Sequence, residues 1–396
     1  MSEKKKKVPQ LRFPGFSGEW EERKLGDLLS ETRRPIKMED DIEYQLVTVK
    51  RRNEGVTSRG LFKGKDILVK NYFELKHGDY VISKRQVVHG ANGIVPEYLD
   101  GAIVSNEYLV SVGNKKITTD FLTIISKLPS MYKMFFLSSY GIDIEKLVFN
   151  VEDWKKRKIF IPPVPEQKIV STFFLILDNA IALQQRKLTH LQARKKGLLQ
   201  KMFPKDGELF PELRFPGFTD AWEERRLGEV VQITMGQSPN SENYTHNPDD
   251  HILVQGNADM RNGQVFPRVW TTQVTKKAEK GDLILSVRAP VGDIGKTYYD
   301  VVLGRGVAAL KGNEFIYQSL GKMKQNGYWN KLSTGSTFEA INSNDIRDAL
   351  LMMPNIEEQA KIGAFFKQLD DSITLHQRKL DHLQTRKKAL LQQMFV

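Results

Sequence analysis

A sixteen-residue phrase occurs twice in this chain and constrains its fold more than any other feature. The phrase "LRFPGFSGEWEERKLG" at residues 11–26 returns as "LRFPGFTDAWEERRLG" at 213–228, with 12 of 16 letters unchanged. A second pair of matching segments lies at 166–203 and 358–395. The first pair is offset by 202 residues and the second by 192, so the second copy is ten residues shorter in its middle. Each half therefore consists of a constant phrase, a variable stretch and a constant segment.

The constant segments have the pattern of coiled-coil helices. Their apolar residues follow one another at alternating steps of four and three, which is typical of a helix-pair seam. Neither segment contains proline, and each follows proline-rich text with acidic residues that favour a helix N-terminus. At about 1.5 Å per residue, each helix would be roughly 55 Å long. The predicted seam residues are Val170, Phe174, Leu177, Ile181, Leu188, Leu191, Leu198, Ile362, Phe366, Leu369, Ile373, Leu380, Leu383 and Leu390.

Two matching stripes in one chain favour pairing with each other over separate packing on a domain, because each supplies the apolar partner that the other lacks. Only nine residues, "PKDGELFPE", separate the first helix from the second phrase, so the second variable stretch must begin near the end of that helix. We therefore expect an antiparallel pair with the variable domains at its opposite ends. Gln184 and His376 hold matching polar seam positions near mid-helix and are expected to help set the register.

The variable stretches predict compact mixed domains. They carry short β-rich runs such as "YQLVTV" and "DLILSV", separated by Gly, Asn and Pro, and one helical stretch each. The expected fold class is α+β, with two mixed α/β domains separated by an antiparallel two-helix coiled coil in a pseudo-twofold internal repeat. The predicted segments are a basic tail at 1–10, a first domain at 11–160, a first helix at 161–204, a linker at 205–212, a second domain at 213–352 and a second helix at 353–396.

Composition narrows the class of partner. The 396 residues carry a net charge of +12, which makes a polyanion such as nucleic acid the leading partner. The absence of cysteine excludes disulfides and thiolate zinc sites and fits a reducing cytosol. No apolar run reaches the length that spans a bilayer, and the N-terminus lacks the apolar core of a signal peptide, so we expect a cytoplasmic protein without membrane contact. The run "EKKKK" at 3–7 is typical of a disordered, solubilising tail.

Polar loops between the predicted strands carry side chains suited to DNA. Arg and Lys read guanine, Asn and Gln read adenine, and glycine lets a backbone approach closely. Loops are polar in most proteins, so each one taken alone is better explained as a solvated turn. In the first domain the candidates are Lys50, Arg51, Arg52, Asn53, Lys84, Arg85, Gln86 and Asn92. In the second domain they are Gln237, Ser238, Asn257, Arg261, Arg288 and Arg305.

Two segments have partial nucleotide-binding patterns. The segment "PVGDIGKT" at 290–297 lacks the leading glycine of a P-loop and has Pro290 in its place. The segment "VVLGRGVAAL" at 301–310 matches a dinucleotide pattern, but Gly312 interrupts the helix that should follow. We therefore expect a glycine-bearing strand crossing there and no nucleotide site in either segment.

No motif predicts catalysis or a bound metal. His246 and His251 flank an acidic pair, but their spacing fits no standard metal site and is better explained by a solvated loop. The chain has no Asn-Pro-Pro-aromatic motif of an amino-group methyltransferase and no nuclease carboxylate-lysine cluster. We therefore expect a reader of another molecule, with no catalytic residue and no cofactor of its own.

The layout resembles the DNA-specificity subunits of type I restriction-modification systems over essentially the whole chain. The matching text is "WEERKLGDLL" and "WEERRLGEVV" opening each half, "SVRAPVGDIGK" within the second, "GSTFEAINSNDIRDALLMMPNIEEQAKI" leading into the second helix, and the looser "GIDIEKLVFNVEDWKKRKIFIPPVPEQKIV" leading into the first. The first variable domain departs from the pattern, because it lacks the Gly-x-Ser-Pro turn that the second has at 236–239.

The resemblance implies that each variable stretch is a target-recognition domain for one half of a bipartite site in double-stranded DNA, with the helices setting the spacing. It also implies that the constant segments dock two modification (methyltransferase) subunits, which bring S-adenosylmethionine and methylate an adenine in each half-site. Restriction subunits, which translocate DNA and use ATP and Mg, would join for cleavage. Two alternatives from other classes are a basic coiled-coil scaffold that binds RNA or protein, and a free-standing enzyme that uses one of the weak motifs.

Overall fold

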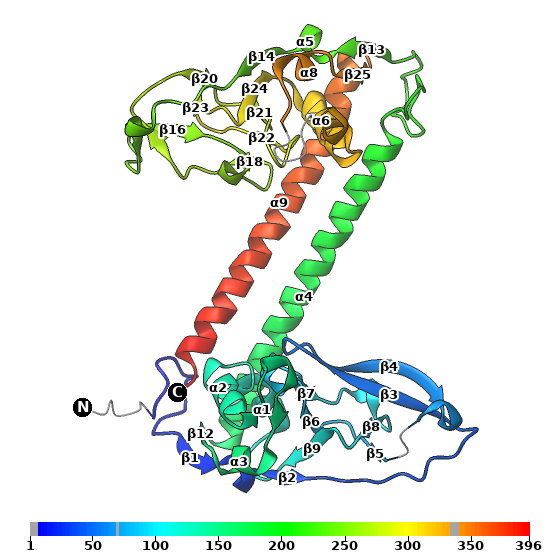
Figure 1. The fold of residues 1–396 in the computed structure, drawn as a ribbon, viewed down its shortest axis with the longest axis vertical. Helices are drawn as coiled ribbons and strands as arrows, with labels where there is room; N and C mark the ends of the chain where they lie inside the picture. The colour runs from blue at the N-terminus through cyan, green and yellow to red at the C-terminus, as the bar shows by residue number, and fades with distance from the viewer. Residues whose placement is uncertain (1–6, 69–70, 333–339) are drawn as a thin grey trace. The chain divides into compact units, whose positions relative to one another are not determined.

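The computed structural model describes residues 7–68, 71–332 and 340–396 (Figure 1). Its internal contacts divide the chain into two units, residues 1–183 with 381–396 and residues 184–380. Most of the predicted "EKKKK" run lies outside the described residues. Residues 333–339, which belong to the segment that leads into the second helix, also lie outside them.

Two long helices occupy the predicted constant segments, α4 (Val164–Lys201) and α9 (Ile356–Gln393). Pro165 lies in the first turn of α4, where its missing N–H would have no partner in the helix. At the start of α9 the Asn355 side chain accepts a hydrogen bond from the Glu358 amide at 2.9 Å. The contact division cuts both helices, so each unit holds one part of α4 and one part of α9.

The first unit contains two four-stranded sheets. One is antiparallel, with strands in the spatial order β2 (Leu29–Glu31), β9 (Tyr108–Gly113), β6 (Tyr80–Ser83) and β7 (Asn92–Ile94). The other contains one parallel contact, with strands in the order β4 (Gly55–Lys63), β3 (Glu43–Lys50), β8 (Ile103–Ser105) and β5 (Tyr72–Glu74).

Short helices and strand pairs complete the first unit. The helices are α1 (Thr119–Ile125), α2 (Pro129–Leu137) and α3 (Val151–Lys156). The strand pairs are β1 (Glu21–Lys24) with β12 (Lys158–Ile161), and β10 (Ser139–Tyr140) with β11 (Val148–Phe149). Because β12 precedes α4 and β1 belongs to the constant phrase, this pairing joins the two constant parts of the first half.

The second unit is also mixed. Its six-stranded sheet has the order β14 (Gln232–Met235), β24 (Val307–Lys311), β21 (Leu283–Ser286), β22 (Ile294–Lys296), β18 (Gln264–Val265) and β17 (Met260–Arg261). Its five-stranded sheet has the order β15 (Tyr244–Thr245), β19 (Trp270–Thr271), β16 (His251–Val254), β23 (Val301–Leu303) and β20 (Lys276–Ala278). The predicted α/β character of both variable stretches is thus confirmed.

The second unit also has short helices and a strand pair that involves the constant phrase. The helices are α5 (Leu227–Val230), α6 (Glu314–Gln325), α7 (Tyr328–Leu332) and α8 (Ser343–Arg347). The strand β13 (Glu223–Arg226) pairs antiparallel with β25 (Leu350–Met353), which precedes α9. The constant phrase is therefore again hydrogen-bonded to the strand that leads into its own long helix.

One central strand in each unit is buried on both faces. In β6, Tyr80 and Ile82 pack in the cluster that includes Trp20, while Val81 packs in a separate cluster on the other face. In β21, Leu285 and Ile284 divide in the same way between two clusters. Alternate side chains of a strand point to opposite faces, so these uninterrupted apolar runs place β6 and β21 between two layers.

The constant phrase is part of the core in both units. Trp20 is 3% exposed, and its ring centroid lies 6.0 Å from that of Phe395. Trp222 is 1% exposed, and its ring centroid lies 5.7 Å from that of Phe203. The phrase is therefore repeated at least in part because its tryptophan contributes to the aromatic core of each unit.

A buried ion pair ties each constant phrase to the start of a long helix. The Arg12 guanidinium donates to both carboxylate oxygens of Glu166, at 2.7 Å each. The Arg214 guanidinium donates to both oxygens of Glu358, also at 2.7 Å each. The two carboxylate side chains are 1% and 0% exposed. We call these pairs the Arg–Glu locks.

Within the first unit, the early part of α4 meets the late part of α9. The ring centroids of Phe174 and Phe395 are 5.8 Å apart, and Lys387 donates a hydrogen bond to Asp178. Higher residue numbers on one segment therefore meet lower numbers on the other. The two segments run in opposite directions in this unit.

Within the second unit, the late part of α4 meets the early part of α9 in the same sense. The Lys195 ammonium donates to the Asp370 carboxylate at 2.6 Å. A hydrogen bond of 2.7 Å joins the His376 ring Nδ1 and the Gln184 side-chain oxygen. The predicted polar seam positions, Gln184 and His376, therefore do meet.

The predicted seam residues are buried or half-buried throughout, with one shift in detail. Leu199 is 1% exposed, whereas its predicted neighbour Leu198 is half-buried. A straight helix has 3.6 residues per turn, so it drifts by about 20° per heptad from a strict 3.5-residue repeat. The drift brings Leu199 into the core near the end of α4.

Candidate nucleic-acid interface

The central strand of each unit ends at a buried serine that starts a polar loop. Ser83 ends β6 and is 7% exposed, and Ser286 ends β21 and is 1% exposed. The arginine two positions later, Arg85 or Arg288, is exposed in both units. The Ser286 hydroxyl donates to the Arg288 carbonyl at 2.9 Å, which fixes the start of the turn. Both predicted arginines therefore leave their domain from the same topological position.

Loops of the second unit line an open cavity of about 750 Å³, which has both polar and apolar residues in its wall. Of the residues predicted for this domain, those that line the cavity are Ser238, Asn257, Arg288 and Arg305. Gln237 is exposed but does not belong to the lining. Arg261 also lies outside it, with its guanidinium 6.0 Å from the centre of the Phe266 ring.

Sequence reasoning missed five further polar residues of this cavity: Tyr244, Gln255, Asp259, Arg268 and Ser286. Asp259, which is 5% exposed, accepts a hydrogen bond from the Gln255 amide at 2.8 Å. Its other carboxylate oxygen lies 3.8 Å from Nε of Arg268. The Asp259 carboxylate therefore connects the segments of Gln255 and Arg268. The lining has three arginines and one acidic residue, so its net charge is positive.

Close backbone packing shapes the same cavity. A Cβ on Gly306 would lie 2.0 Å from the Gln255 carbonyl oxygen, and a Cβ on Gly236 would lie 2.0 Å from the Gly304 carbonyl oxygen. The Arg305 amide donates to the Ser238 hydroxyl at 3.0 Å. The first two contacts require glycine, and the hydrogen bond gives Ser238 its place in the Gly-x-Ser-Pro turn. The dinucleotide-like segment forms β23, a turn and β24, so no helix follows its glycines.

In the first unit, two predicted groups of residues lie side by side. The turn between β3 and β4 contains Arg52 and Asn53, whose amides donate to the carbonyls of His89 and Gly90 at 2.7 and 3.0 Å. These carbonyls belong to the loop that follows β6, and Figure 1 shows the turn beside β7 at the end of that loop. Lys50, Arg51 and Arg52 are exposed, so this corner of the unit presents a basic surface.

Most of these basic side chains have weak partners. The Arg85 Nε lies 3.0 Å from the Glu107 carboxylate, and an Arg51 nitrogen lies 2.8 Å from the Glu145 carboxylate. Lys84 donates to the Asn106 carbonyl at 2.7 Å. Exposed ion pairs contribute about 0 to 1 kcal/mol, so DNA phosphates can replace such partners at little cost.

Asn92 is the least exposed of the residues predicted for the first unit. Asn92 is 3% exposed, accepts a hydrogen bond from the Tyr80 hydroxyl at 3.0 Å and donates one to Asn53 at 3.4 Å. The Asn92 amide group is therefore bonded to the turn between β3 and β4 from inside the domain, and we remove Asn92 from the candidate contacts. Gln86 and Asn53 are half-buried.

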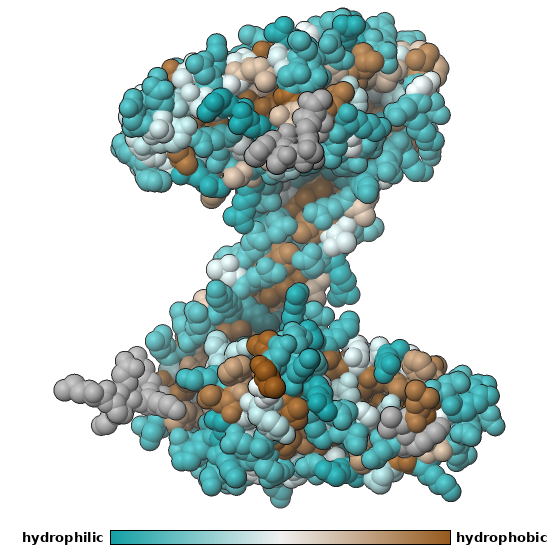
Figure 2. All heavy atoms as spheres, in the orientation of Figure 1, coloured by the Kyte–Doolittle hydropathy of each residue, from teal (hydrophilic) through white to brown (hydrophobic). Residues whose placement is uncertain are grey.

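Neither metal-binding residues nor a membrane span is found in the described part of the chain. No cluster of three or more His, Cys, Asp or Glu occurs there that could hold a metal. Within the same residues, no helix is both long enough and apolar enough to cross a bilayer. Hydrophilic residues cover most of the visible face of each globular part (Figure 2).

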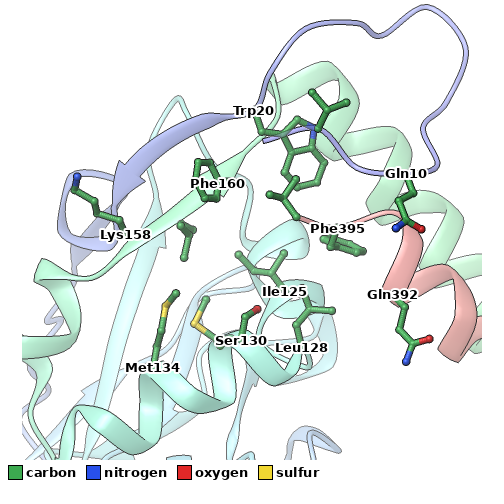
Figure 3. A pocket seen from close by; sticks show the side chains of 14 residues that line it. Gln10, Trp20, Ile125, Leu128, Ser130, Met134, Lys158, Phe160, Gln392 and Phe395 are labelled. Carbon is green, nitrogen blue, oxygen red and sulfur yellow. The ribbon is translucent and has the colours of Figure 1, made fainter. Parts of the chain in front are cut away.

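The first unit also has a largely apolar cavity of about 330 Å³, whose lining includes none of the basic-corner residues Lys50, Arg51 and Arg52. Trp20, Phe160 and Phe395 line it together with Ile125 and Met134 (Figure 3). A cavity of about 410 Å³ in the second unit is lined by residues at the matching repeat positions: Phe203, Pro204, Leu350, Leu351 and Met352. Each unit therefore has a cavity at the same place in the repeat, beside the constant Phe395 or Phe203.

Two units of like plan, each with an arginine-bearing loop at the end of its central strand, define a class of duplicated binding proteins. The comparison with known families identifies the class more closely. The family described as "Type I restriction modification DNA specificity domain" matches residues 17–193 and 219–385. The chain belongs to this family.

Curated relatives agree with the family match. The "Putative type I restriction enzyme MjaX specificity subunit" of Methanocaldococcus jannaschii is 29% identical over 253 residues, which are 61% of this chain and 59% of that relative. The type I restriction enzyme MjaVIII specificity subunit of the same organism is 20% identical over 98% of this chain and 93% of its own length.

Solved structures show the same fold. The S subunit of a type I restriction-modification system from M. genitalium has a TM-score of 0.68 at 14% identity, with 98% of this chain and 99% of that chain covered. A chain from a study of complex assembly and conformational transition in a type I R-M system has a TM-score of 0.52 at 23% identity, with 97% of each chain covered.

Proposed function

We propose that this chain is the sequence-reading subunit of a type I restriction-modification complex, and that each globular domain reads one half of a bipartite site in double-stranded DNA. The observation that carries the proposal is the repeated placement of Arg85 and Arg288 after the buried central strand of their units. The text around them differs between the halves, so the two half-sites are expected to differ in sequence.

We further propose that α4 and α9 form one antiparallel coiled coil related by a pseudo-twofold axis. The interhelix ion pairs support this, because residues 192 apart exchange roles: Lys195 and Asp370 in one unit correspond to Lys387 and Asp178 in the other. Gln184 corresponds to His376, its own partner, and so marks the axis. Such a pair would set the separation of the two domains and hence the spacer between half-sites, at about one helical turn of DNA.

The partners in this proposal are two modification subunits, docked on the constant parts of each half. The cavities beside Phe395 and Phe203 support this, because the two phenylalanines hold the same position in the repeat, where a partner present twice would meet both. S-adenosylmethionine would enter with the modification subunits, and ATP and Mg with restriction subunits. This chain would contribute recognition and no chemistry, in the cytoplasm where the DNA lies.

The binding energy would come from two sources. Lys and Arg contacts to phosphates would supply a salt-dependent affinity that is common to all sequences. The arginine-lined cavity of the second unit and the basic corner of the first would supply discrimination of about 1 to 3 kcal/mol per base pair.

Selection from a pool of random duplex DNA tests the proposal, with the full chain used alone and together with its modification subunits. We expect enrichment of a motif with two short defined parts and a spacer of fixed length. Enrichment of a single short motif would contradict two readers on one spacer. Preference for RNA over duplex DNA would favour the scaffold alternative.

A further inference from the structure

The turn between β3 and β4 holds an arginine in a backbone conformation that arginine disfavours. Arg52 and Asn53 have φ angles of +59° and +57°, and the Glu54 amide donates to the Arg51 carbonyl at 3.3 Å. Two central residues with positive φ and this hydrogen bond fit a type I′ turn. Such turns strongly prefer Asn or Asp followed by Gly, because a Cβ is strained there.

The same chain contains the ordinary solution to this turn. The hairpin of β17 and β18 pairs Arg261 with Gln264, and its two turn residues are Asn262 and Gly263. Their φ angles are +54° and +72°. The first unit therefore has an arginine, Arg52, at the turn position that Asn262 occupies in the hairpin of the second unit.

Tertiary contacts hold the strained turn in place. The Arg52 and Asn53 amides are both bonded to the loop that follows β6. A Cβ on Gly90 would lie 3.0 Å from the Asn53 amide nitrogen, so this loop leaves no space between itself and the turn. The contacts fix where the Arg52 side chain starts, and they use only the backbone of that residue.

The Arg52 side chain does not contribute to holding the turn. It is exposed and makes no hydrogen bond or ion pair to the described part of the chain. Its neighbour Arg51 differs, because its guanidinium is paired with Glu145 at 2.8 Å. Local strain that no internal contact of the side chain compensates is typical of residues kept for function.

We infer that Arg52 is a specificity-determining residue that reads a base edge in the first half-site. The inference rests on the proposed function and deepens it. The planar guanidinium of arginine can donate two parallel hydrogen bonds to the O6 and N7 atoms of one guanine, which adds geometric specificity to the contact. The rigid turn, anchored on the loop that carries Arg85, would supply the fixed starting point that such a contact requires.

The test uses the full chain with its modification subunits and compares wild type, Arg52→Asn and Arg59→Ala. Arg52→Asn places at this turn the residue type that the second unit has at position 262, so it removes the guanidinium and lowers the backbone strain. Arg59→Ala removes an exposed arginine from β4 of the same hairpin, where φ is ordinary. It controls for the loss of one positive charge.

We expect Arg52→Asn to raise the Tm of the first unit by about 2 to 4 °C. Discrimination should fall by roughly 5- to 150-fold at one base pair of the first half-site, with the second half-site unchanged. Arg59→Ala should leave the selected motif as it is.

Three results would overturn the inference: an unchanged motif, an equal loss of affinity for all sequences, or a relaxed motif accompanied by a lower Tm. The second would assign Arg52 to phosphate contact only, and the third would make it a structural residue. If wild type itself selects no bipartite motif, the proposed function fails. If wild type selects one and Arg52→Asn selects the same, only the inference about Arg52 fails.

Discussion

The Arg214–Glu358 lock offers the sharpest test of how the constant phrase is used. Glu358→Gln keeps the shape of the side chain and removes its charge. Removing one partner of a buried pair costs about 3 to 5 kcal/mol, because the other charge stays desolvated. The Glu358 side chain is 0% exposed, but that of Arg214 is 13% exposed and keeps some water. We therefore expect a loss at the lower end, about 3 kcal/mol.

Hydrogen exchange followed by mass spectrometry measures this loss unit by unit. The chain has two units, so one global transition would not separate them. For a unit of this size, 3 kcal/mol corresponds to a fall in Tm of about 6 to 12 °C. Peptides from β13 and the start of α9 should exchange faster, while peptides from the first unit should not change.

Two matched variants make the expectation refutable. Glu166→Gln should produce the same loss in the first unit, since Arg12 and Glu166 have the same geometry. Arg214→Met combined with Glu358→Met should recover most of the stability, because no charge is then left without a partner. A loss below about 1 kcal/mol in Glu358→Gln would show that the lock is solvated and that our reasoning about its burial is wrong.

Three further predictions follow from the site and the helix pair. Arg288→Ala should lower the discrimination between bases at one position of the second half-site by about 1 to 3 kcal/mol, and Arg85→Ala should do so at one position of the first. Methylome sequencing measures both effects. An unchanged methylation pattern would remove that arginine from the interface. Lys50→Ala should reduce the slope of log affinity against log salt by about 1 and leave the recognised bases unchanged, as measured by titration at several salt concentrations; a changed motif would refute a phosphate role. Leu199→Ala should destabilise the second unit by about 2 to 5 kcal/mol and half-buried Leu198→Ala by less; equal losses in hydrogen exchange would contradict the observed shift of the seam.

The repeat and the long helices could be predicted from sequence because their signals are local or periodic. The predicted helices at 161–204 and 353–396 differ by only three residues at each end from α4 (Val164–Lys201) and α9 (Ile356–Gln393). The choice between Leu198 and Leu199 could not be made, since it depends on how far the helix drifts from a strict heptad and on the core that surrounds its end.

The site was harder to predict because its residues come from distant parts of the chain. Arg268 and Gln255 reach the cavity of the second unit through Asp259, and neither lies in a motif. Asn92 looked like a base-reading residue in a polar loop, but β7 places it beneath Tyr80. The sequence alone does not distinguish a polar side chain that is hydrogen-bonded within its domain from one that is free to bind a ligand. The 14 predicted DNA contacts therefore remain predictions, apart from Asn92, which we withdraw.

The exchange of charges between α4 and α9 has a consequence for how such proteins change. Asp178 and Lys195 of α4 meet Lys387 and Asp370 of α9, so the proposed coiled coil would be self-complementary. A half of this chain would therefore fit any other half that carries the same helix, including a copy of itself. Recombination between related genes could then assemble new combinations of two targets without a new joint having to evolve.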